Sequence, residues 1–538
     1  MSARLQRRPV LLALLLAVTV TAWSFVYSSK VGGGSDSYGY LSEAELFLNG
    51  QVAIDQSFTN ALPWAQPRVT FTPLGYRLSD DASGRIVPIY PPGFPLLLAG
   101  AKKIAGDSAK FWIVPISAGL LVFAAFGIGR RLASDAAGLI GAWLVATSPA
   151  VLNMSVQTMS DVPAAGVFAA ALWLSLADSA PALAAAGLLS GLGILIRPNL
   201  APLAAALALR FVIELFNPSM RRRALILGTI FSAGVLAGAG VLAAMNHATY
   251  GAALRSGYGS LNGFFAADHI RPNITNYFSW LVESQTWIAI PGLAAIFVPS
   301  RRLWPAAPGR HVVLVAATFT AALWGMYLVY MVFDVWWYLR FLLASWPLIM
   351  VGVGALAMLL TRWRPITRPL VVAGVVALGC YGVYQSYRYG VFDIWRIERR
   401  FIAAGKIAER WTVPNSVIIS GHHSGSLRYY AGRMTMRYDM IEHDDVDRVV
   451  DWLRNQGVHV YLLVERWELE DIDTRYDKTR AMDAIETAPL VIFNDPGEFW
   501  LFDLSHPRRP GDPIEMVTGV DRGLRVPGPA AFPQLVFR

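Results

Sequence analysis

The sequence has few charged residues and a single cysteine, and these two features exclude a class of protein and a kind of covalent cross-link. Only 15% of the 538 residues are charged, whereas an average soluble domain carries about 25%. An ordinary water-soluble globular chain is therefore excluded. The single cysteine, Cys380, excludes an intrachain disulfide, and cysteine usage therefore does not indicate in which cellular compartment the protein lies.

Hydrophobic residues are abundant instead, at 55% of the chain. They gather in runs of about 17–25 residues, the length that crosses a bilayer as a helix. The sequence predicts eleven such spans, near residues 9–28, 111–129, 137–153, 162–178, 181–196, 198–216, 224–245, 276–297, 312–333, 340–361 and 368–385. This pattern predicts a polytopic α-helical membrane protein.

Arginine clusters set the predicted orientation, because cationic connectors stay on the cytoplasmic side. They lie in alternate short connectors, at Arg130–Arg131, Arg221–Arg223, Arg301–Arg302 and Arg362–Arg368. The N-terminus is then cytoplasmic, and eleven spans place residues 386–538 outside. This anchoring also explains the net charge of +9, so no nucleic-acid partner is predicted. The run 9–28 could be a cleaved signal peptide, but it exceeds the usual length of about 7–15 residues.

The chain changes character near residue 390. Apolar runs shorten to strand length at 417–420, 458–464, 490–493 and 499–504, with helical composition between them at 445–456 and 479–487. Strands alternating with helices predict an α/β domain. We therefore predict a transmembrane domain over 1–385 and an extracytoplasmic α/β domain over 386–538. The first outer loop, 29–110, should hold two helices lying at the membrane interface, near 41–49 and 93–100.

Two aspartates lie at the predicted outer ends of spans. Asp36 stands in Gly-Gly-Gly-Ser-Asp-Ser-Tyr, and Asp161 in Met-Ser-Asp-Val-Pro. A carboxylate at the hydrocarbon boundary is costly unless partnered, which indicates a functional site. Either could instead cap a helix, since Asp favours N-caps. We predict both as catalytic-site residues, and we interpret Glu43, two turns beyond Asp36, as a solvated charge.

Five cations on the predicted outer face are candidates for binding a phosphate: Arg197, Arg340, Arg271, Lys102 and Lys103. Arginine forks match phosphate geometry, although such side chains also extend to lipid headgroups without any binding role. Aromatic and proline residues near these cations in the sequence predict a surface at the membrane interface that contacts the acceptor or the lipid. Its members are Tyr38, Tyr90, Pro91, Trp337 and Tyr338.

No metal ligand is assigned from the sequence. Asp36, Asp161 and the pair Asp268–His269 could meet around Mg²⁺ or Mn²⁺ and clamp a diphosphate. A monophosphate donor needs no such clamp. A divalent cation therefore stays an alternative.

Several of these segments together resemble the GT-C membrane glycosyltransferases. They are Asp36 in an early outer loop, Tyr-Pro-Pro at 90–92, Ser-Pro-Ala-Val-Leu-Asn-Met-Ser-Val-Gln-Thr-Met-Ser-Asp-Val-Pro at 148–163, and Gly-Leu-Gly-Ile-Leu-Ile-Arg-Pro-Asn at 191–199. The superfamily includes the protein O-mannosyltransferases and the lipid A aminoarabinose transferase. The resemblance covers about residues 5–385 and implies the GT-C fold, with a polyprenyl-phosphate sugar as donor.

The expected function is that of an inverting hexosyl- or pentosyltransferase of the bacterial inner membrane. It would move a sugar on the outer face to an envelope glycan, lipid or protein. Phosphate is already a good leaving group, so the reaction needs one base for the acceptor and cations for the phosphate. Asp36 is the predicted base. One alternative is a transporter or flippase of lipid-linked saccharides, which would place charged groups at the bilayer midplane and show internal repeats. The other alternative is a non-catalytic envelope-assembly subunit.

Overall fold

The structure is a computed structural model that describes residues 3–81, 83–260, 263–519 and 533–537. It divides into two compact units. The helical unit comprises Met1–Ser28, Pro91–Met245 and Gly259–Phe392, and the sheet unit comprises Ser29–Tyr90, Asn246–Tyr258 and Asp393–Arg538. The boundary at 392/393 lies close to the predicted one at 385/386. Residues 29–90 and 246–258, which were predicted as parts of the transmembrane domain, group with the sheet unit.

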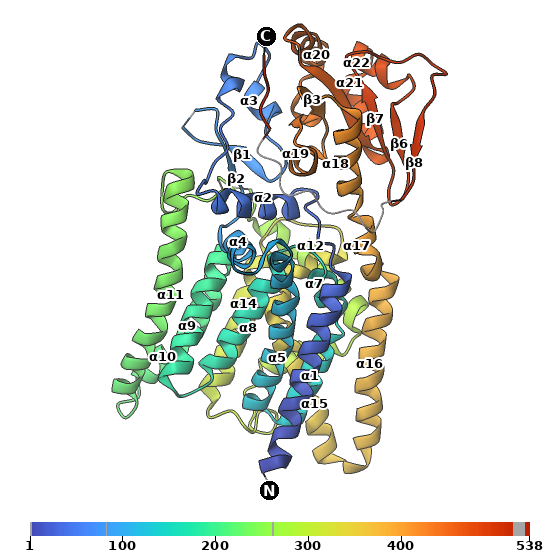
Figure 1. The fold of residues 1–538 in the computed structure, drawn as a ribbon. Helices are drawn as coiled ribbons and strands as arrows, with labels where there is room; N and C mark the ends of the chain where they lie inside the picture. The colour runs from blue at the N-terminus through green and yellow to red at the C-terminus, as the bar shows by residue number, and fades with distance from the viewer. Residues whose placement is uncertain (1–2, 82, 261–262, 520–532, 538) are drawn as a thin grey trace. The chain divides into compact units, whose positions relative to one another are not determined.

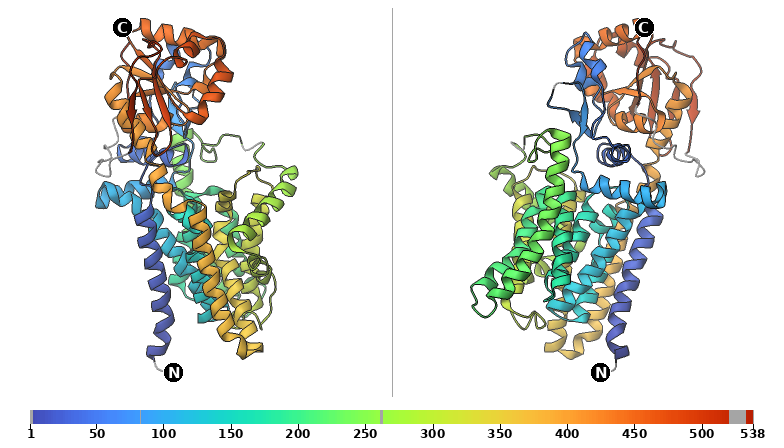
Figure 2. Two further views of the ribbon diagram at one scale, coloured as in Figure 1. Left: turned by 90° about the vertical axis from the view of Figure 1, so that its right-hand side faces the viewer. Right: turned by 60° about the vertical axis from the view of Figure 1, so that its left-hand side comes forward.

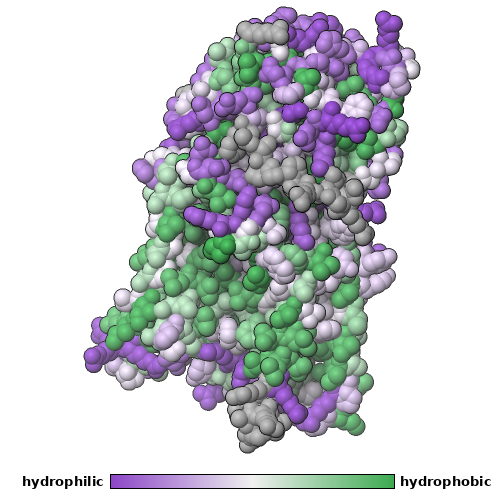
Figure 3. Space-filling view, in the orientation of Figure 1, coloured by the Kyte–Doolittle hydropathy of each residue, from purple (hydrophilic) through white to green (hydrophobic). Residues whose placement is uncertain are grey.

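The long helices of the helical unit run side by side, whereas the shorter α4 (Gly93–Ala105) lies across them (Figures 1 and 2). In chain order the helices of this unit are α1 (Ala3–Tyr27), α4, α5 (Ile113–Leu132), α6 (Asp135–Ala146), α7 (Pro149–Ser155), α8 (Asp161–Ser175), α9 (Ala180–Ile196), α10 (Ala201–Leu215), α11 (Arg221–Tyr250), α12 (Ile270–Gln285), α13 (Ala289–Ile296), α14 (Arg310–Leu328), α15 (Trp346–Trp363) and α16 (Arg368–Arg388). The space-filling view shows apolar side chains gathered over these helices (Figure 3). The chain is a multi-pass membrane protein.

All eleven predicted spans coincide with helical segments. Seven helices in the described chain are long and apolar enough to cross a membrane: α1, α5, α10, α11, α14, α15 and α16. The predicted span 137–153 is a pair, α6 and α7, bent by 57°. The apolar helices α8 and α9 have 15 and 17 residues, and 276–297 is divided between α12 and α13. The count of eleven therefore stays a prediction.

Small residues allow these helices to pack closely. A Cβ atom on Gly129 of α5 would lie 2.5 Å from the Cα of Gly138 on α6. Small residues at contacts let helix backbones approach where lipid supplies no hydrophobic drive. A Cβ on Gly93 would likewise lie 2.4 Å from the carbonyl carbon of Leu195. This contact sets the start of α4 against the end of α9, directly before Arg197.

The sheet unit contains a six-stranded sheet in the order β4-β3-β5-β7-β6-β8. The strands are β3 (Ser416–Ile419), β4 (Met434–Met436), β5 (His459–Glu465), β6 (Val491–Phe493), β7 (Phe499–Asp503) and β8 (Glu515–Val517). β3 is parallel to both β4 and β5, whereas β7 is antiparallel to β5 and β6. The predicted α/β domain is confirmed. The short strands β4 and β8 were not predicted.

Both faces of this sheet are buried. Val417 and Ile419 of β3 belong to one apolar core, and Ile418 between them belongs to the other, because successive strand residues point to opposite faces. Helices cover the sheet: α18 (Arg400–Trp411), α19 (Ser424–Ala431), α20 (Val446–Asn455), α21 (Leu469–Tyr476) and α22 (Arg480–Ile485). Burial on both faces explains the continuous apolar runs that the sequence shows.

Residues 29–90 pack into the same unit. They form α2 (Asp36–Leu48), α3 (Pro67–Thr70) and a hairpin of β1 (Tyr76–Leu78) with β2 (Ile86–Pro88). Leu62, Trp64 and Phe71 join the core that holds Val417 and Ile419. The helices predicted near 41–49 and 93–100 exist as α2 and α4. Most of α2 is buried, however, from Tyr38 to Leu46, so it is not an exposed interfacial helix.

Candidate functional site

In the helical unit, Asp161 is held by two arginines from distant segments. The side chain of Asp161 is fully buried, and its Oδ1 lies 2.8 Å from Nη1 of Arg197 and 3.9 Å from Nε of Arg340. A buried carboxylate is costly unless paired. The two guanidinium groups supply that pairing. The structure thus brings together three residues that the sequence analysis selected separately, and we call them the Asp161 cluster.

Local sequence explains how each member reaches this place. Asp161 is the first residue of α8, where an acidic side chain suits the positive end of the helix dipole. Pro198 prevents α9 from continuing, so Arg197 adopts an extended backbone directly after Ile196. Arg340 lies in a short 3₁₀ segment, Trp336–Ser345, that leads into α15.

Aromatic rings support both arginines. The guanidinium carbon of Arg197 lies 5.7 Å from the ring centre of Phe341, and that of Arg340 lies 5.3 Å from the same ring and 5.1 Å from Tyr338. Tyr327 stacks on Phe341 at 4.8 Å, and its hydroxyl accepts a hydrogen bond from Asn199. These rings fix the guanidinium planes. The sequence analysis missed Phe341, Tyr327 and Asn199, although Phe341 directly follows Arg340.

The Asp161 cluster carries a net positive charge, since two guanidinium groups meet one carboxylate. The side chains of Arg197 and Arg340 are 16% and 15% exposed, whereas Asp161 is inaccessible. An anion can therefore reach the arginines but not the acid. Planar guanidinium forks suit phosphate oxygens. The arrangement fits phosphate binding, with Asp161 positioning the arginines.

The other predicted cations lie in different surroundings. Lys102 on α4 forms an ion pair with Asp107 at 3.0 Å. Lys103 and Arg271 are exposed, and neither pairs with Asp161 in the described chain. Trp337 is 44% exposed, consistent with an interfacial position.

In the sheet unit, Asp36 is the first residue of α2 and is bound by Tyr90. The Tyr90 hydroxyl donates a hydrogen bond of 2.5 Å to Oδ1 of Asp36 and lies 2.7 Å from Oγ of Ser35. Gly39 makes this approach possible, because a Cβ there would lie 2.5 Å from the Tyr90 ring. Burial, followed by the charge of Asp36, raises the pKa of Tyr90 well above its ordinary value. Tyr90 therefore stays protonated and orients the Asp36 carboxylate.

Two neighbours on α2 differ from the sequence-based interpretation. Tyr38, predicted to contact acceptor or lipid, is 2% exposed and packs edge-on against Tyr429. Glu43, interpreted as a solvated charge, is 3% exposed, and burial raises its pKa well above the ordinary value. That interpretation of Glu43 was wrong, because tertiary packing covers this face of α2.

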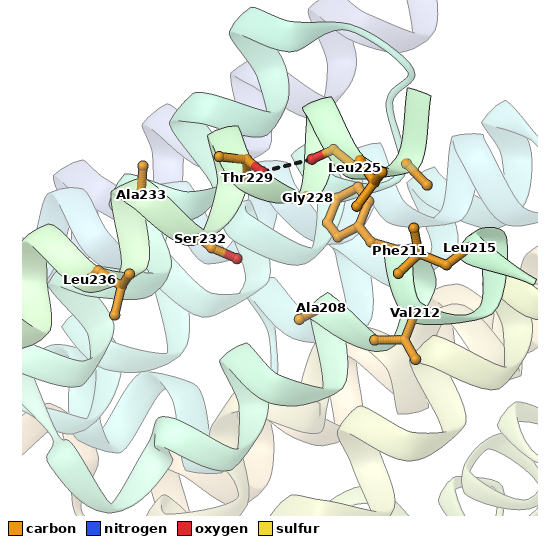
Figure 4. A pocket seen from close by; sticks show the side chains of 11 residues that line it. Ala208, Phe211, Val212, Leu215, Leu225, Gly228, Thr229, Ser232, Ala233 and Leu236 are labelled. Carbon is orange, nitrogen blue, oxygen red and sulfur yellow. Dashed lines mark hydrogen bonds between the residues drawn. The ribbon is translucent and has the colours of Figure 1, made fainter. Parts of the chain in front are cut away.

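A pocket of about 380 Å³ lies elsewhere in the helical unit, between α10 and α11 (Figure 4). Its lining includes Phe211, Val212, Leu225 and Leu236, and it contains no ionisable side chain. The Thr229 hydroxyl bonds back to the carbonyl of Leu225. This pocket therefore holds no side chain that could act in catalysis or bind a phosphate by charge.

Comparison with known proteins agrees with this architecture. Residues 90–246 match the family model described as dolichyl-phosphate-mannose-protein mannosyltransferase. The structure resembles ArnT from Cupriavidus metallidurans bound to undecaprenyl phosphate, at a TM-score of 0.54 and 14% identity, over 92% of this chain and 99% of that one. It also resembles the apo oligosaccharyltransferase of Archaeoglobus fulgidus, at a TM-score of 0.55 and 12% identity, over 94% and 75%. No protein of curated function matches in sequence.

The fold is that of the GT-C glycosyltransferases. The resemblance inferred from the sequence is therefore confirmed for the fold. The matched family segment includes Asp161 and Arg197, whereas Asp36 and Arg340 lie outside it. Asp36 and Asp161 belong to different units, and their sharing of one site stays a prediction.

A divalent ion does not fit the Asp161 cluster. Oxygen-rich ligand sets bind Mg²⁺ or Mn²⁺, whereas here the only carboxylate among the three residues is already paired with a guanidinium group at 2.8 Å. Two nearby cations would repel a third. Asp268 is exposed, and Nδ1 of His269 lies 3.2 Å from a backbone carbonyl.

Proposed function

We propose that this protein is an inverting glycosyltransferase that moves a sugar from a polyprenyl phosphate to an acceptor of the bacterial cell envelope. The acceptor would be a glycan, a lipid or a protein at the outer face of the inner membrane. The observation that carries the proposal is the Asp161 cluster, a net-positive, partly accessible arginine pair within a GT-C fold. One structural relative was solved with undecaprenyl phosphate and another with dolichol-phosphate.

The donor phosphate would bind Arg197 and Arg340. Their forks neutralise the charge that develops on the leaving phosphate, which is where stabilisation lowers the barrier. Lys102, Lys103 and Arg271 would assist at the membrane surface. The exposed Trp337, with Tyr338 and Pro91, would contact the prenyl chain near the headgroups.

Asp36 would act as the base. Its carboxylate takes the proton from an acceptor hydroxyl, the acceptor oxygen forms a bond to the anomeric carbon, and the bond from that carbon to the phosphate oxygen breaks. The polyprenyl phosphate leaves from the opposite face, so the anomeric configuration inverts. Tyr90 fixes the carboxylate by donating to its Oδ1. A positioned base typically contributes about 10²–10⁴ in rate.

The first test is binding of undecaprenyl phosphate to purified protein, measured by native mass spectrometry. Arg197→Ala should weaken binding, and Asp36→Asn should not. The second test is sugar transfer in cells, measured by mass spectrometry of envelope glycans and lipids. Those of a deletion strain should lack one sugar that the wild type carries. Complementation of that strain by Asp36→Asn at the wild-type level would refute the role of Asp36.

A further inference from the structure

A second group of polar and aromatic side chains lies at one edge of the sheet, and the proposed reaction does not use it. β3 and β5 are parallel, with Ile418 opposite Tyr461. His422 follows the carboxyl end of β3, and Glu465 and Trp467 lie at the carboxyl end of β5. In α/β sheets, ligands bind outside the carboxyl ends of the strands. This edge is therefore the first place to expect a ligand in the sheet unit.

Glu465 is the centre of the group. Its Oε1 accepts hydrogen bonds from Nε of Arg400 at 2.9 Å and from Nε2 of His423 at 3.0 Å. Its Oε2 accepts a bond of 2.8 Å from the indole nitrogen of Trp467. Both oxygens are thus engaged, and three side chains from different elements are held in fixed positions.

A second acid fixes the backbone at the same edge. Glu468 is 1% exposed, and its carboxylate accepts hydrogen bonds of 2.9 Å from the backbone nitrogens of His422 and Glu465. One buried side chain thereby joins the loops that follow β3 and β5. A preorganised surface of this kind loses little entropy when it binds a ligand.

Trp467 gives this edge its ligand-binding character. Its side chain is 63% exposed although its N–H is tied to Glu465. The His422 ring meets it edge-on at 5.6 Å, and Nη2 of Arg400 lies 3.4 Å from Nε2 of His422. An exposed ring that is fixed by its polar end presents a flat apolar face. Hydrogen-bonding groups stand beside that face, which is what a sugar ring requires.

The charges of this edge favour a neutral ligand. Burial, followed by the neighbouring His423, lowers the pKa of His422 to about 4, so its imidazole is uncharged at neutral pH. Burial opposes ionisation of Glu465, but the hydrogen bond from His423 and the charge of Arg400 hold its pKa below the ordinary value. The charge of Arg400 is thereby matched by a carboxylate. Among the residues described at this edge, Arg400 and Arg466 are paired with Glu465 and Glu498, so a phosphate would meet no unmatched cation, whereas hydroxyl groups would find donors and acceptors.

This edge lies beside the loop that carries Asp36. A Cβ on Gly34 would lie 3.6 Å from Cε1 of His422, and one on Gly33 would overlap the Phe401 ring. The loop also bonds to α19, since the backbone nitrogen of Gly32 donates to the Tyr430 hydroxyl at 2.7 Å. Asp36 follows two residues after Gly34, within the same unit.

We propose that Trp467, His422 and Arg400 form a subsite for a neutral sugar ring of the acceptor. The ring would stack on the indole, and its hydroxyls would bond to the imidazole and the guanidinium group. This subsite deepens the proposed function and rests on it only in presenting the acceptor to Asp36. It also predicts the acceptor class, a carbohydrate or a glycosylated lipid or protein.

The test uses full-length protein in nanodiscs and a panel of neutral methyl glycosides of hexoses and pentoses. Saturation-transfer NMR should detect binding of at least one glycoside. Trp467→Ala should weaken it about tenfold or more, while Trp467→Phe keeps an aromatic face and should retain part of it. Arg466→Ala is the matched control, because its side chain is 72% exposed and forms an ion pair with Glu498 at 3.1 Å. This control should bind as the wild type does.

Each outcome decides the question. Absence of glycoside binding by wild-type protein, or unchanged binding by Trp467→Ala, would overturn the subsite. Preference for inorganic phosphate over every glycoside would overturn its neutral character. Asp36→Asn should bind glycosides normally while losing transfer, so failure of the proposed function and failure of the subsite give different results.

Discussion

Arg197→Ala tests the central feature of the helical unit, the buried ion pair with Asp161. The variant keeps the carboxylate buried but removes the guanidinium group that lies 2.8 Å from it. Arg340 remains, with its Nε at 3.9 Å. The variant therefore measures how much of the free energy of unfolding depends on the nearer cation, Arg197.

The expected cost follows from these distances. At an effective dielectric constant of about 20, unit charges 2.8 Å apart attract by about 6 kcal/mol, and charges 3.9 Å apart by about 4 kcal/mol. Breaking a buried pair typically costs about 3–5 kcal/mol, because an uncompensated charge stays behind. Partial compensation by Arg340 places Arg197→Ala near the lower end of that range. Asp161→Asn should cost less, since it removes the buried charge itself.

The assay is thermal unfolding of purified protein, combined with binding of undecaprenyl phosphate. Arg197→Ala should lower the midpoint by several degrees and more than Asp161→Asn does. The double variant Arg197→Gln/Asp161→Asn should recover much of the stability but not the binding. Arg364→Ala, an exposed control, should change neither the midpoint nor the fold. An unchanged midpoint for Arg197→Ala, or no recovery in the double variant, would refute the reasoning.

Three further predictions concern catalysis, pH dependence and topology. Asp36→Asn should reduce transfer in the deletion strain by about 10²–10⁴ while undecaprenyl-phosphate binding persists, and equal loss of both would instead indicate misfolding. Glu43→Gln should be increasingly more stable than the wild type as pH rises from 5 to 8: burial raises the folded pKa of Glu43, so the wild type loses up to about 1.4 kcal/mol per pH unit above the unfolded pKa. A stability difference independent of pH would contradict this. Reporter fusions after Arg302 and Arg364 should report the cytoplasm and a fusion at residue 538 the outside; an outside signal at Arg364 would break the predicted topology.

The sequence by itself determined the elements whose signal is local. Every apolar run predicted as a span coincides with helix, although the number of helices that cross the membrane stays a prediction, and short apolar runs located β3, β5, β6 and β7. Helix-breaking and end signals were also local, as at Arg197-Pro198. The strands β4 and β8 are short and interrupted by polar residues, Met-Thr-Met and Glu-Met-Val, so they gave no usable pattern, whereas the equally short β6 lies within the apolar run 490–493. The aspartates and arginines were recognised from their residue type and their place at the ends of spans.

Only the tertiary structure decided which of these residues meet. The pairing of Asp161 with Arg197 and Arg340 joins three segments, and nothing local encodes it. The same holds for Tyr90 on Asp36 and for the burial of Glu43, which reversed its predicted state. Residues 29–90 joined the C-terminal sheet because Trp64 and Phe71 find their apolar partners there. Burial and long-range ion pairs depend on the whole packed chain, and so a local pattern predicts the elements but not their contacts.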